Sequence, residues 1–166
     1  MADKQIKQLS EEDNPVSGDW FVMQRGSDDE TVKVDAEAVM PFSDGDSAYV
    51  ATSQTTTSTS YADLATAGPA VTVTIGQSGM AIVGLYCGCN NSGGNNSTMG
   101  FVASGANTIA ASDIYCVSHN GSGQDNHSGV HLLTGLTPGS TVFTAKYKVS
   151  AGTGTFLDRR IFVIPL

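Results

Sequence analysis

The sequence predicts an all-β protein, an antiparallel β-sandwich with jelly-roll wiring, and three observations lead to that prediction. From Ala48 onward, short segments rich in Val, Ile, Thr and aromatic residues recur at close spacing. Clusters of Gly, Asn, Ser and Pro, which tight turns favour, separate these segments. No stretch has the periodicity of a long helix. At 166 residues, the chain has room for one substantial core and a small appendage.

We expect the appendage to be an acidic attachment segment, residues 1–46, followed by an assembly and display domain, residues 47–166. The first segment holds 12 of the 16 acidic residues and four of the eight basic ones, so it carries the whole net charge of −8. A neutral segment can pack against copies of itself, whereas an acidic one repels its copies unless a basic partner binds it. The display domain is therefore expected to assemble and the acidic segment to attach.

A small β-hairpin is expected inside the attachment segment. Residues 19–25 form a short apolar run, residues 26–29 a turn, and residues 30–34 a second strand with alternating polarity. Large aromatic side chains in so polar a segment often anchor an interface, although packing of the hairpin on its own domain is an alternative. The apolar anchors of the segment are Ile6, Leu9, Trp20 and Phe21.

The display domain is expected to contain eight or nine strands. Alternation such as that of Val71, Val73 and Ile75 predicts strands with one buried face. We place the strands at residues 49–56, 59–65, 69–76, 79–89, 98–104, 112–118, 129–134, 140–149 and 154–164.

The last of these strands carries apolar residues on both faces, in the run Ile161, Phe162, Val163 and Ile164. Such a strand needs cover on both sides. In a small sandwich the second cover is best supplied by other subunits around a symmetry axis, because open apolar surface on a monomer promotes aggregation. We therefore predict that these four residues form core and subunit interface, with Phe162 in the core.

Composition disfavours several classes of partner. The chain lacks the clusters of Lys and Arg with which proteins bind nucleic acids and anionic membranes. It has no apolar run of about 20 residues, as a membrane helix needs, and its first residues lack the apolar core of a secretion signal. We expect synthesis in a cytoplasm and neither a nucleic-acid nor a membrane partner.

The cysteines predict no disulfide framework and no zinc site. Cys87 and Cys89 would share one face of a strand as small buried residues, and Cys116 is left without a partner. A Cys-x-x-Cys pair, which zinc sites commonly use, is absent. Acidic pairs such as Asp44 and Asp46 do not have the spacing of a calcium loop. We expect no metal and no cofactor.

The sequence predicts that the protein is not an enzyme. A Gly-x-Ser-x-Gly elbow is absent, and the histidines lie in or beside a polar stretch, residues 118–128, with the composition of a solvated turn. A zinc ion in this stretch is a disfavoured alternative. The residue types of a triad or metal site are nevertheless present, in His119, His127, His131, Asp113 and Asp125.

Recognition is the more useful function for this polar stretch. Long polar loops on a rigid sandwich are common binding sites, against the simpler alternative of a solvated turn. The residues expected to contact a glycan or another molecular surface are Tyr115, His119, Asn120, Gln124, Asp125 and Asn126.

Four segments of the display domain carry a family resemblance: residues 57–74 (TSTSYADLATAGPAVTVT), 134–140 (TGLTPGS), 152–156 (GTGTF) and 159–166 (RRIFVIPL). Together they resemble a C-terminal domain common in virion proteins of tailed bacteriophages, which occurs on head fibres, capsid decoration proteins and tail-associated fibres. The front of the chain, with Ile6-Lys-Gln-Leu9, Pro15 and Gly18-Asp19, is similar to the attachment region of many phage fibre proteins. The resemblance covers most of the chain.

This resemblance implies a homotrimeric jelly roll in the virion, made in the bacterial cytoplasm and displayed by an N-terminal anchor. The implied partner of the anchor is the major capsid protein or another virion protein. No collagen repeat, heptad pattern or repeated β unit forms a shaft between anchor and domain, which favours a capsid decoration protein or short head fibre. The alternative is a tail-fibre or collar module that binds a host receptor or glycan.

Overall fold

The computed structural model describes residues 20–24, 31–35 and 45–166. The chain divides into two compact units, residues 1–41 and 42–166, which are described separately. In the first unit, β1 (Trp20–Gln24) pairs antiparallel with β2 (Thr31–Asp35), so that Trp20 lies opposite Asp35. The predicted hairpin is therefore confirmed. The candidate anchors Ile6 and Leu9 lie outside the described residues.

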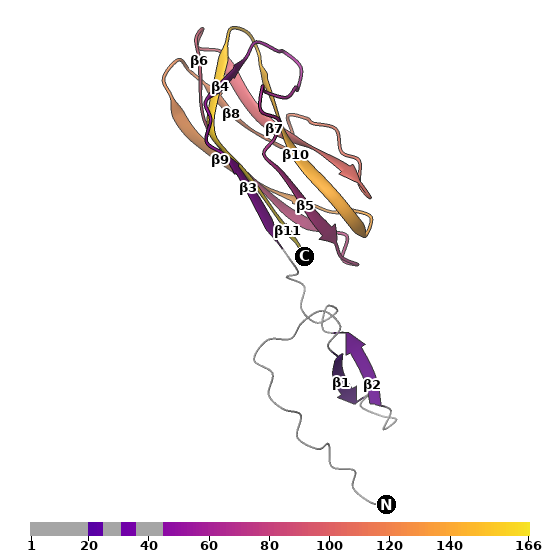
Figure 1. The fold of residues 1–166 in the computed structure, drawn as a ribbon. Coiled ribbons are helices and arrows are strands. Elements are labelled where there is room, and N and C mark those ends of the chain that lie inside the picture. Colours follow the sequence, from indigo (N-terminus) through magenta and orange to yellow (C-terminus); the bar gives the residue numbers. More distant parts are fainter. Residues whose placement is uncertain (1–19, 25–30, 36–44) are drawn as a thin grey trace, which may run out of the picture. The chain divides into compact units, whose positions relative to one another are not determined.

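The second unit is a sandwich of two antiparallel sheets, which confirms the predicted fold class (Figure 1). All the elements in the described part of the chain are strands, and none of its residues forms a helix that could cross a bilayer. The strands of this unit are β3 (Asp46–Val50), β4 (Gln54–Thr56), β5 (Ala70–Ile75), β6 (Ala81–Asn91), β7 (Asn96–Gly105), β8 (Cys116–Asn120), β9 (Asp125–Leu133), β10 (Gly139–Val149) and β11 (Gly154–Pro165).

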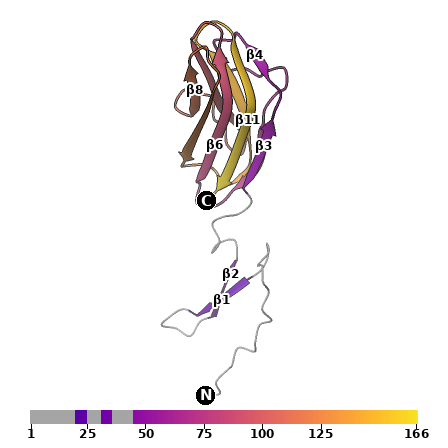
Figure 2. The same ribbon diagram turned by 90° about the vertical axis from the view of Figure 1, so that its left-hand side faces the viewer.

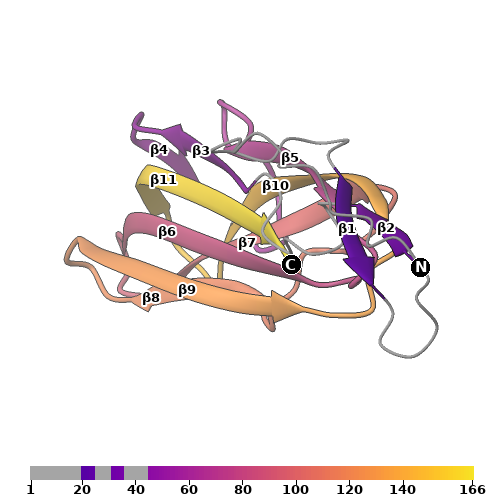
Figure 3. The same cartoon turned by 90° about the horizontal axis from the view of Figure 1, so that it is seen from below.

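The strand order is that of a jelly roll. One sheet, named here the β11 sheet, has the order β3-β11-β6-β9, with β4 also paired to β11 (Figure 2). The other, the β10 sheet, has the order β5-β10-β7-β8. In this unit β3 and β4 follow one another within the β11 sheet, and β7 and β8 within the β10 sheet, whereas the chain crosses between the two sheets at each of the remaining connections. Seen from below, β11, β6 and β9 form one layer with β10 and β7 behind it (Figure 3).

The core lies between the sheets and is built from alternate residues of the strands. Val71, Val73 and Ile75 are buried as predicted, and the residues between them are exposed. Aromatic rings fill the centre: the centroids of Phe101 and Phe143 lie 5.8 Å apart. Those of Tyr147 and Phe156 are separated by 5.0 Å, a spacing typical of favourable aromatic pairs.

The strand predicted at residues 59–65 is wrong. Only Ala62 pairs with β10 there, through two 2.9 Å backbone hydrogen bonds to Tyr147. The hydroxyl of Ser58 donates to the carbonyl of Ser60 at 2.6 Å and also accepts from its amide at 3.3 Å. Such local side-chain bonds compete with a strand ladder, so a segment rich in Ser and Thr turns where its composition predicts a strand.

Arg159 is a fully buried charge that the sequence did not reveal. Its guanidinium lies 5.3 Å from the ring centroid of Tyr147. It donates to carbonyl oxygens of Thr52, Thr66 and Gly68 at 3.3–3.4 Å and to Oε1 of Gln54 at 3.1 Å. These bonds attach the segment between β3 and β5, which includes β4, to the core, where an unpaired cation would be costly.

Candidate functional site

The outer face of the β11 sheet is apolar across three neighbouring strands. In register, Ile82 lies between Leu132 and Ile164, and Gly84 lies between Val130 and Phe162. Val130 is 66% exposed, Leu132 58% and Phe162 37%. We name this set the apolar face: Ile82, Val130, Leu132, Phe162 and Ile164.

A glycine at the centre of the apolar face makes room for an aromatic ring. A Cβ on Gly84 would lie 1.9 Å from Cε1 of Phe162, so the ring occupies the space that any side chain at position 84 would need. Glycine inside a strand often marks such a close approach. The ring of Phe162 therefore covers β6 and makes the face continuous from β11 to β9.

The four residues of the predicted core and interface divide between the two faces of β11. Ile161 and Val163 are fully buried in the core, whereas Phe162 and Ile164 belong to the outer face. The placement of Phe162 in the core is thus wrong, because strict alternation puts it on the opposite face from its neighbours. The expected interface role of the run remains a prediction.

A polar row borders the apolar face. Tyr49, Arg160, Tyr86 and Ser128 lie side by side on β3, β11, β6 and β9. The guanidinium carbon of Arg160 lies 4.3 Å from the ring centroid of Tyr49, whose hydroxyl donates to Asp158. That carboxylate raises the pKa of Tyr49 by accepting the hydrogen bond. The apolar face thus has a polar rim, the arrangement usual in protein interfaces.

The stretch predicted to be a polar loop is mostly strand. Residues 116–120 form β8 and residues 125–133 form β9, so only residues 121–124 connect them. The predicted binding residues Asn120, Gln124, Asp125 and Asn126 are exposed at this end, and His119 is half-buried beside them. Tyr115 lies apart: its ring stacks on Phe101 at 5.9 Å and packs against the core.

Two histidines and an aspartate converge between the ends of β8 and β9. Nε2 of His127 lies 2.9 Å from Nδ1 of His119 and 3.8 Å from a carboxylate oxygen of Asp125. The rings of the two histidines are 4.9 Å apart between centroids. His131, the third histidine, instead contacts Tyr115 edge-on at 5.9 Å. The sequence shows that residue types suited to a metal site are present, but only the fold brings His119, Asp125 and His127 together.

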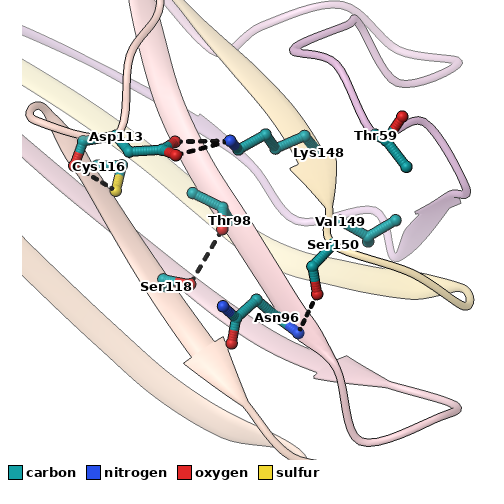
Figure 4. Close-up of a pocket in the computed structure, with 9 residues that line it drawn as sticks. All are labelled: Thr59, Asn96, Thr98, Asp113, Cys116, Ser118, Lys148, Val149 and Ser150. Carbon is teal, nitrogen blue, oxygen red and sulfur yellow. Dashed lines mark hydrogen bonds and ion pairs between the residues drawn. The ribbon is translucent and has the colours of Figure 1, made fainter.

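A hollow of about 430 Å³ opens on the outer side of the β10 sheet (Figure 4). Hydrogen bonds join its walls: the hydroxyls of Thr98 and Ser118 lie 3.0 Å apart, and the amide of Asn96 donates to Ser150 at 3.0 Å. It is lined by Thr59, Asn96, Thr98, Asp113, Cys116, Ser118, Lys148, Val149 and Ser150.

One wall of the hollow is an ion pair backed by a tyrosine. Nζ of Lys148 lies 2.7 Å from a carboxylate oxygen of Asp113, and the Tyr61 hydroxyl donates to the same carboxylate at 2.8 Å. Lys148, followed by Tyr61, holds the pKa of Asp113 below its usual range. Burial is the main cause that raises the pKa of Tyr61, and Asp113 adds to it. The charges of Lys148 and Asp113 thus neutralise each other, an arrangement typical of an ion pair with a structural role.

The hollow does not have the features of a nucleophilic site. Burial raises the pKa of the Cys116 thiol, which keeps it protonated near neutral pH, whereas a reactive cysteine needs a lowered pKa. None of the three histidines lines the hollow, so its two serines, Ser118 and Ser150, have no imidazole base among the lining residues. Cys87 and Cys89 are fully buried in the core, as their spacing predicts.

No protein-family model and no curated protein matches the chain. Among solved structures it is similar to Eiger TNF from S. frugiperda, with a TM-score of 0.50, 10% identity, and coverage of 76% of this chain and 94% of that one. It is also similar to the CBM22-1 xylan-binding domain of Paenibacillus barcinonensis Xyn10C (TM-score 0.36, 12% identity, 89% and 86% covered). A third similar structure comes from Bacillus endospore appendages, disulfide-linked pili (TM-score 0.26, 14% identity, 74% and 91% covered). At these identities the likeness concerns the fold alone, and the chain is similar to jelly-roll-like β domains.

Proposed function

We propose that this protein is a structural virion protein of a tailed bacteriophage, a homotrimeric head fibre or capsid decoration protein without catalytic activity. The observation that carries the proposal is the apolar face of the β11 sheet. Val130 and Leu132, both more than half exposed, lie next to Phe162 in one register-aligned patch. Contiguous patches of this kind, bordered by polar residues, mark interaction sites.

The occupant that we assign to the apolar face is the same face of two further copies. The display domain has as many basic as acidic residues, so its copies do not repel one another strongly. Closing three copies around an axis would bury the exposed apolar side chains at a benefit of about 25 cal/mol per Å² of apolar surface. The polar row with Tyr49 and Arg160 would form the rim of that contact.

The acidic segment supplies the attachment in this proposal. Its net charge of −8 suits basic groups on a capsid lattice, and Trp20 and Phe21, with Ile6 and Leu9, would supply apolar contacts. Three such segments on one trimer would bind together, so weak single contacts would give tight occupancy through high effective concentration. The major capsid protein is the partner that this arrangement fits.

Immunogold electron microscopy tests the location. Particles released by the producing cells are labelled with antibody raised against residues 47–166. The proposal predicts gold distributed over the heads. Gold confined to a tail tip or collar would instead favour the alternative module, and particles without label would contradict a virion role.

A deletion tests the anchor. Removing residues 1–41 takes away the whole first unit and leaves the second, which has its own core, intact. The shortened protein is expected to fold and form trimers but no longer to bind particles in a co-sedimentation assay. Particle binding equal to that of the full chain would show that attachment lies elsewhere.

A tail module that binds a host glycan is a second candidate, favoured by one contact. The side-chain amide of Asn120, beside the turn at residues 121–124, donates to Oδ1 of Asn96 at 2.7 Å. Asn96 also lines the hollow, so the polar turn and the hollow form one continuous polar surface. Binding of the full chain to host surface glycan, lost on Asn120→Ala and kept in a variant of the apolar face, would support this function.

A further inference from the structure

We propose that His119, Asp125 and His127 form a binding site for one divalent transition-metal ion, with Zn²⁺ as the best match. One ligand atom from each residue lies within 4.8 Å of the other two. Two imidazole nitrogens and one carboxylate are a ligand set that zinc uses with water in the fourth position, whereas calcium and magnesium prefer oxygen ligands alone. This inference is independent of the virion role and of trimer formation.

The distances between the ligand atoms fit a tetrahedral ion after small side-chain shifts. The two facing nitrogens are 2.9 Å apart, and the carboxylate oxygen of Asp125 lies 3.8 Å from Nε2 of His127. Nitrogens that bind one zinc ion at about 2.0–2.1 Å in a tetrahedron are about 3.3 Å apart. One distance is shorter and the other longer by about half an ångström, and the ligand atoms of His119 and Asp125 lie within 4.8 Å of each other. Rotations of these exposed or half-buried side chains would bring all three atoms to the ion.

A second hydrogen bond prepares His119 for the role. Its Nε2 lies 2.9 Å from the carbonyl oxygen of Gly123, which can only accept, so the ring carries a hydrogen on Nε2. In the neutral ring this leaves the lone pair of Nδ1 directed at His127. Metal-bound histidines usually donate their other N–H to a carbonyl or carboxylate in this way. On binding, His127 would carry its hydrogen on Nδ1 and offer Nε2 to the ion.

The fold makes the site possible because it places two edge strands opposite each other. His119 lies on β8 of the β10 sheet, whereas Asp125 and His127 lie on β9 of the β11 sheet. The strands β8 and β9 lie side by side there (Figure 3). They approach closely, since a Cβ on Gly129 of β9 would lie 2.8 Å from the Val117 side chain of β8. A bound ion would therefore tie the two sheets together across the turn at residues 121–124.

Titration of the full chain without an affinity tag tests the site. ZnCl₂ in calorimetry, and CoCl₂ followed by its visible absorption as a reporter of tetrahedral geometry, are expected to show one equivalent bound. His119→Gln and His127→Gln should each weaken binding at least tenfold, because each removes one of three protein ligands. His131→Gln is the matched control, since it removes a histidine from β9 outside the cluster and should bind as the wild type does.

A variant of Asp125, the most exposed of the three ligands, keeps the test informative if a histidine variant does not fold. The Asp125 side chain is 68% exposed, so Asp125→Asn should preserve the fold and weaken binding. In side-chain NMR spectra, Zn²⁺ should shift the ring signals of His119 and His127 and leave those of His131 unchanged. Absence of binding to the wild type, or unchanged affinity in folded His119→Gln and His127→Gln proteins, would overturn the proposal.

Discussion

At the scale of single residues, the contact between Gly84 and Phe162 decides the character of the apolar face. The ring of Phe162 lies where a side chain on residue 84 would be, and no other residue type fits at that position with the ring in place. The sequence reveals that Phe162 is apolar and near the C-terminal end, but a neighbour on another strand sets the position of its ring. Contacts of this kind depend on register, which one strand does not specify alone.

Gly84→Ala is expected to weaken self-association with little effect on folding. The added Cβ must displace the ring of Phe162, which can swing toward solvent because it is 37% exposed. We therefore expect the free energy of unfolding to change by less than about 1 kcal/mol. Urea unfolding and sedimentation at several concentrations measure the two effects. Gly123→Ala is the control, because a Cβ added at that position would have no atom within 4 Å. Equal association of both variants would show that the position of the Phe162 ring does not affect the contact between copies.

Burial should leave Cys116 as the one cysteine that reacts in the folded protein, because Cys87 and Cys89 are fully buried. The pKa of Cys116 is raised by burial, so its thiolate fraction at pH 8 is below that of a free cysteine. A hydrogen bond with Cys89, followed by burial, raises the pKa of Cys87. In the folded protein, iodoacetamide should modify Cys116 alone and slowly, with a rate that still rises with pH where the rate of a free cysteine has levelled off. Mass spectrometry measures the modification, and Cys116→Ser should remain unmodified. A rate that levels off at the same pH as that of a free cysteine would show that burial does not raise the pKa of Cys116.

At the scale of the elements, a bulge in β11 sets which residues enter the core. The register with β6 shifts between Leu157 and Arg160, where Asp158 adopts a positive φ of 50°. The extra residue changes the alternation, so that Arg159 is buried and Arg160 is exposed. Without the bulge, the face that carries Phe156 would next include Asp158 and Arg160. The same shift puts Ile161 and Val163 in the core and Phe162 on the outer face.

Asp158→Val should destabilise the fold through this bulge. A β-branched residue in the left-handed region costs about 1–2 kcal/mol, and Asp and Asn are the non-glycine residues that best tolerate it. We expect a loss of about that size in the free energy of unfolding, measured by urea denaturation. Asp158→Asn, which keeps a tolerated backbone conformation, is the matched control and should lose less. Equal losses in both variants would show that the backbone conformation is not the cause.

Turn chemistry and alternation were sufficient to predict most strands, including β5, β6, β7, β10 and β11 to within a few residues. They failed where side chains compete with the backbone, as at Ser58 and Ser60, and where strand continues through a polar sequence, as at Asp125 and Asn126. The ladder to β6 stabilises the latter residues, and that partner is distant in the sequence. The buried Arg159 could not be predicted, because its burial follows from the bulge.

At the scale of the whole molecule, the charge distribution and the jelly roll are consistent with the proposed roles of attachment for the acidic segment and assembly for the display domain. The acidic residues are concentrated before the display domain, and the display domain carries one apolar outer face. The β10 sheet instead bears polar residues on its outer side, such as Thr72 and Thr74, which are exposed. Composition predicted that subunits would supply cover. It could not show that the exposed apolar side chains lie on the β11 sheet across β11, β6 and β9, because that requires the strand order.

The same limit applies to the histidine cluster. The sequence separates His119 from His127 by eight positions and gives the stretch the composition of a turn. Their convergence depends on the passage of the chain from the edge of one sheet to the edge of the other. A spacing typical of known metal sites is absent, so sequence patterns alone did not favour an ion there.

Sedimentation equilibrium of the full chain measures self-association through the apolar face. We expect a mass three times the 17.1 kDa of one chain for the wild type. We expect a folded monomer for Val130→Asp, because a charge would be buried unpaired at the contact, and a trimer for Thr74→Asp on the outer side of the other sheet. A wild-type mass of a single chain, or a Val130→Asp protein that still forms trimers, would contradict the proposed contact.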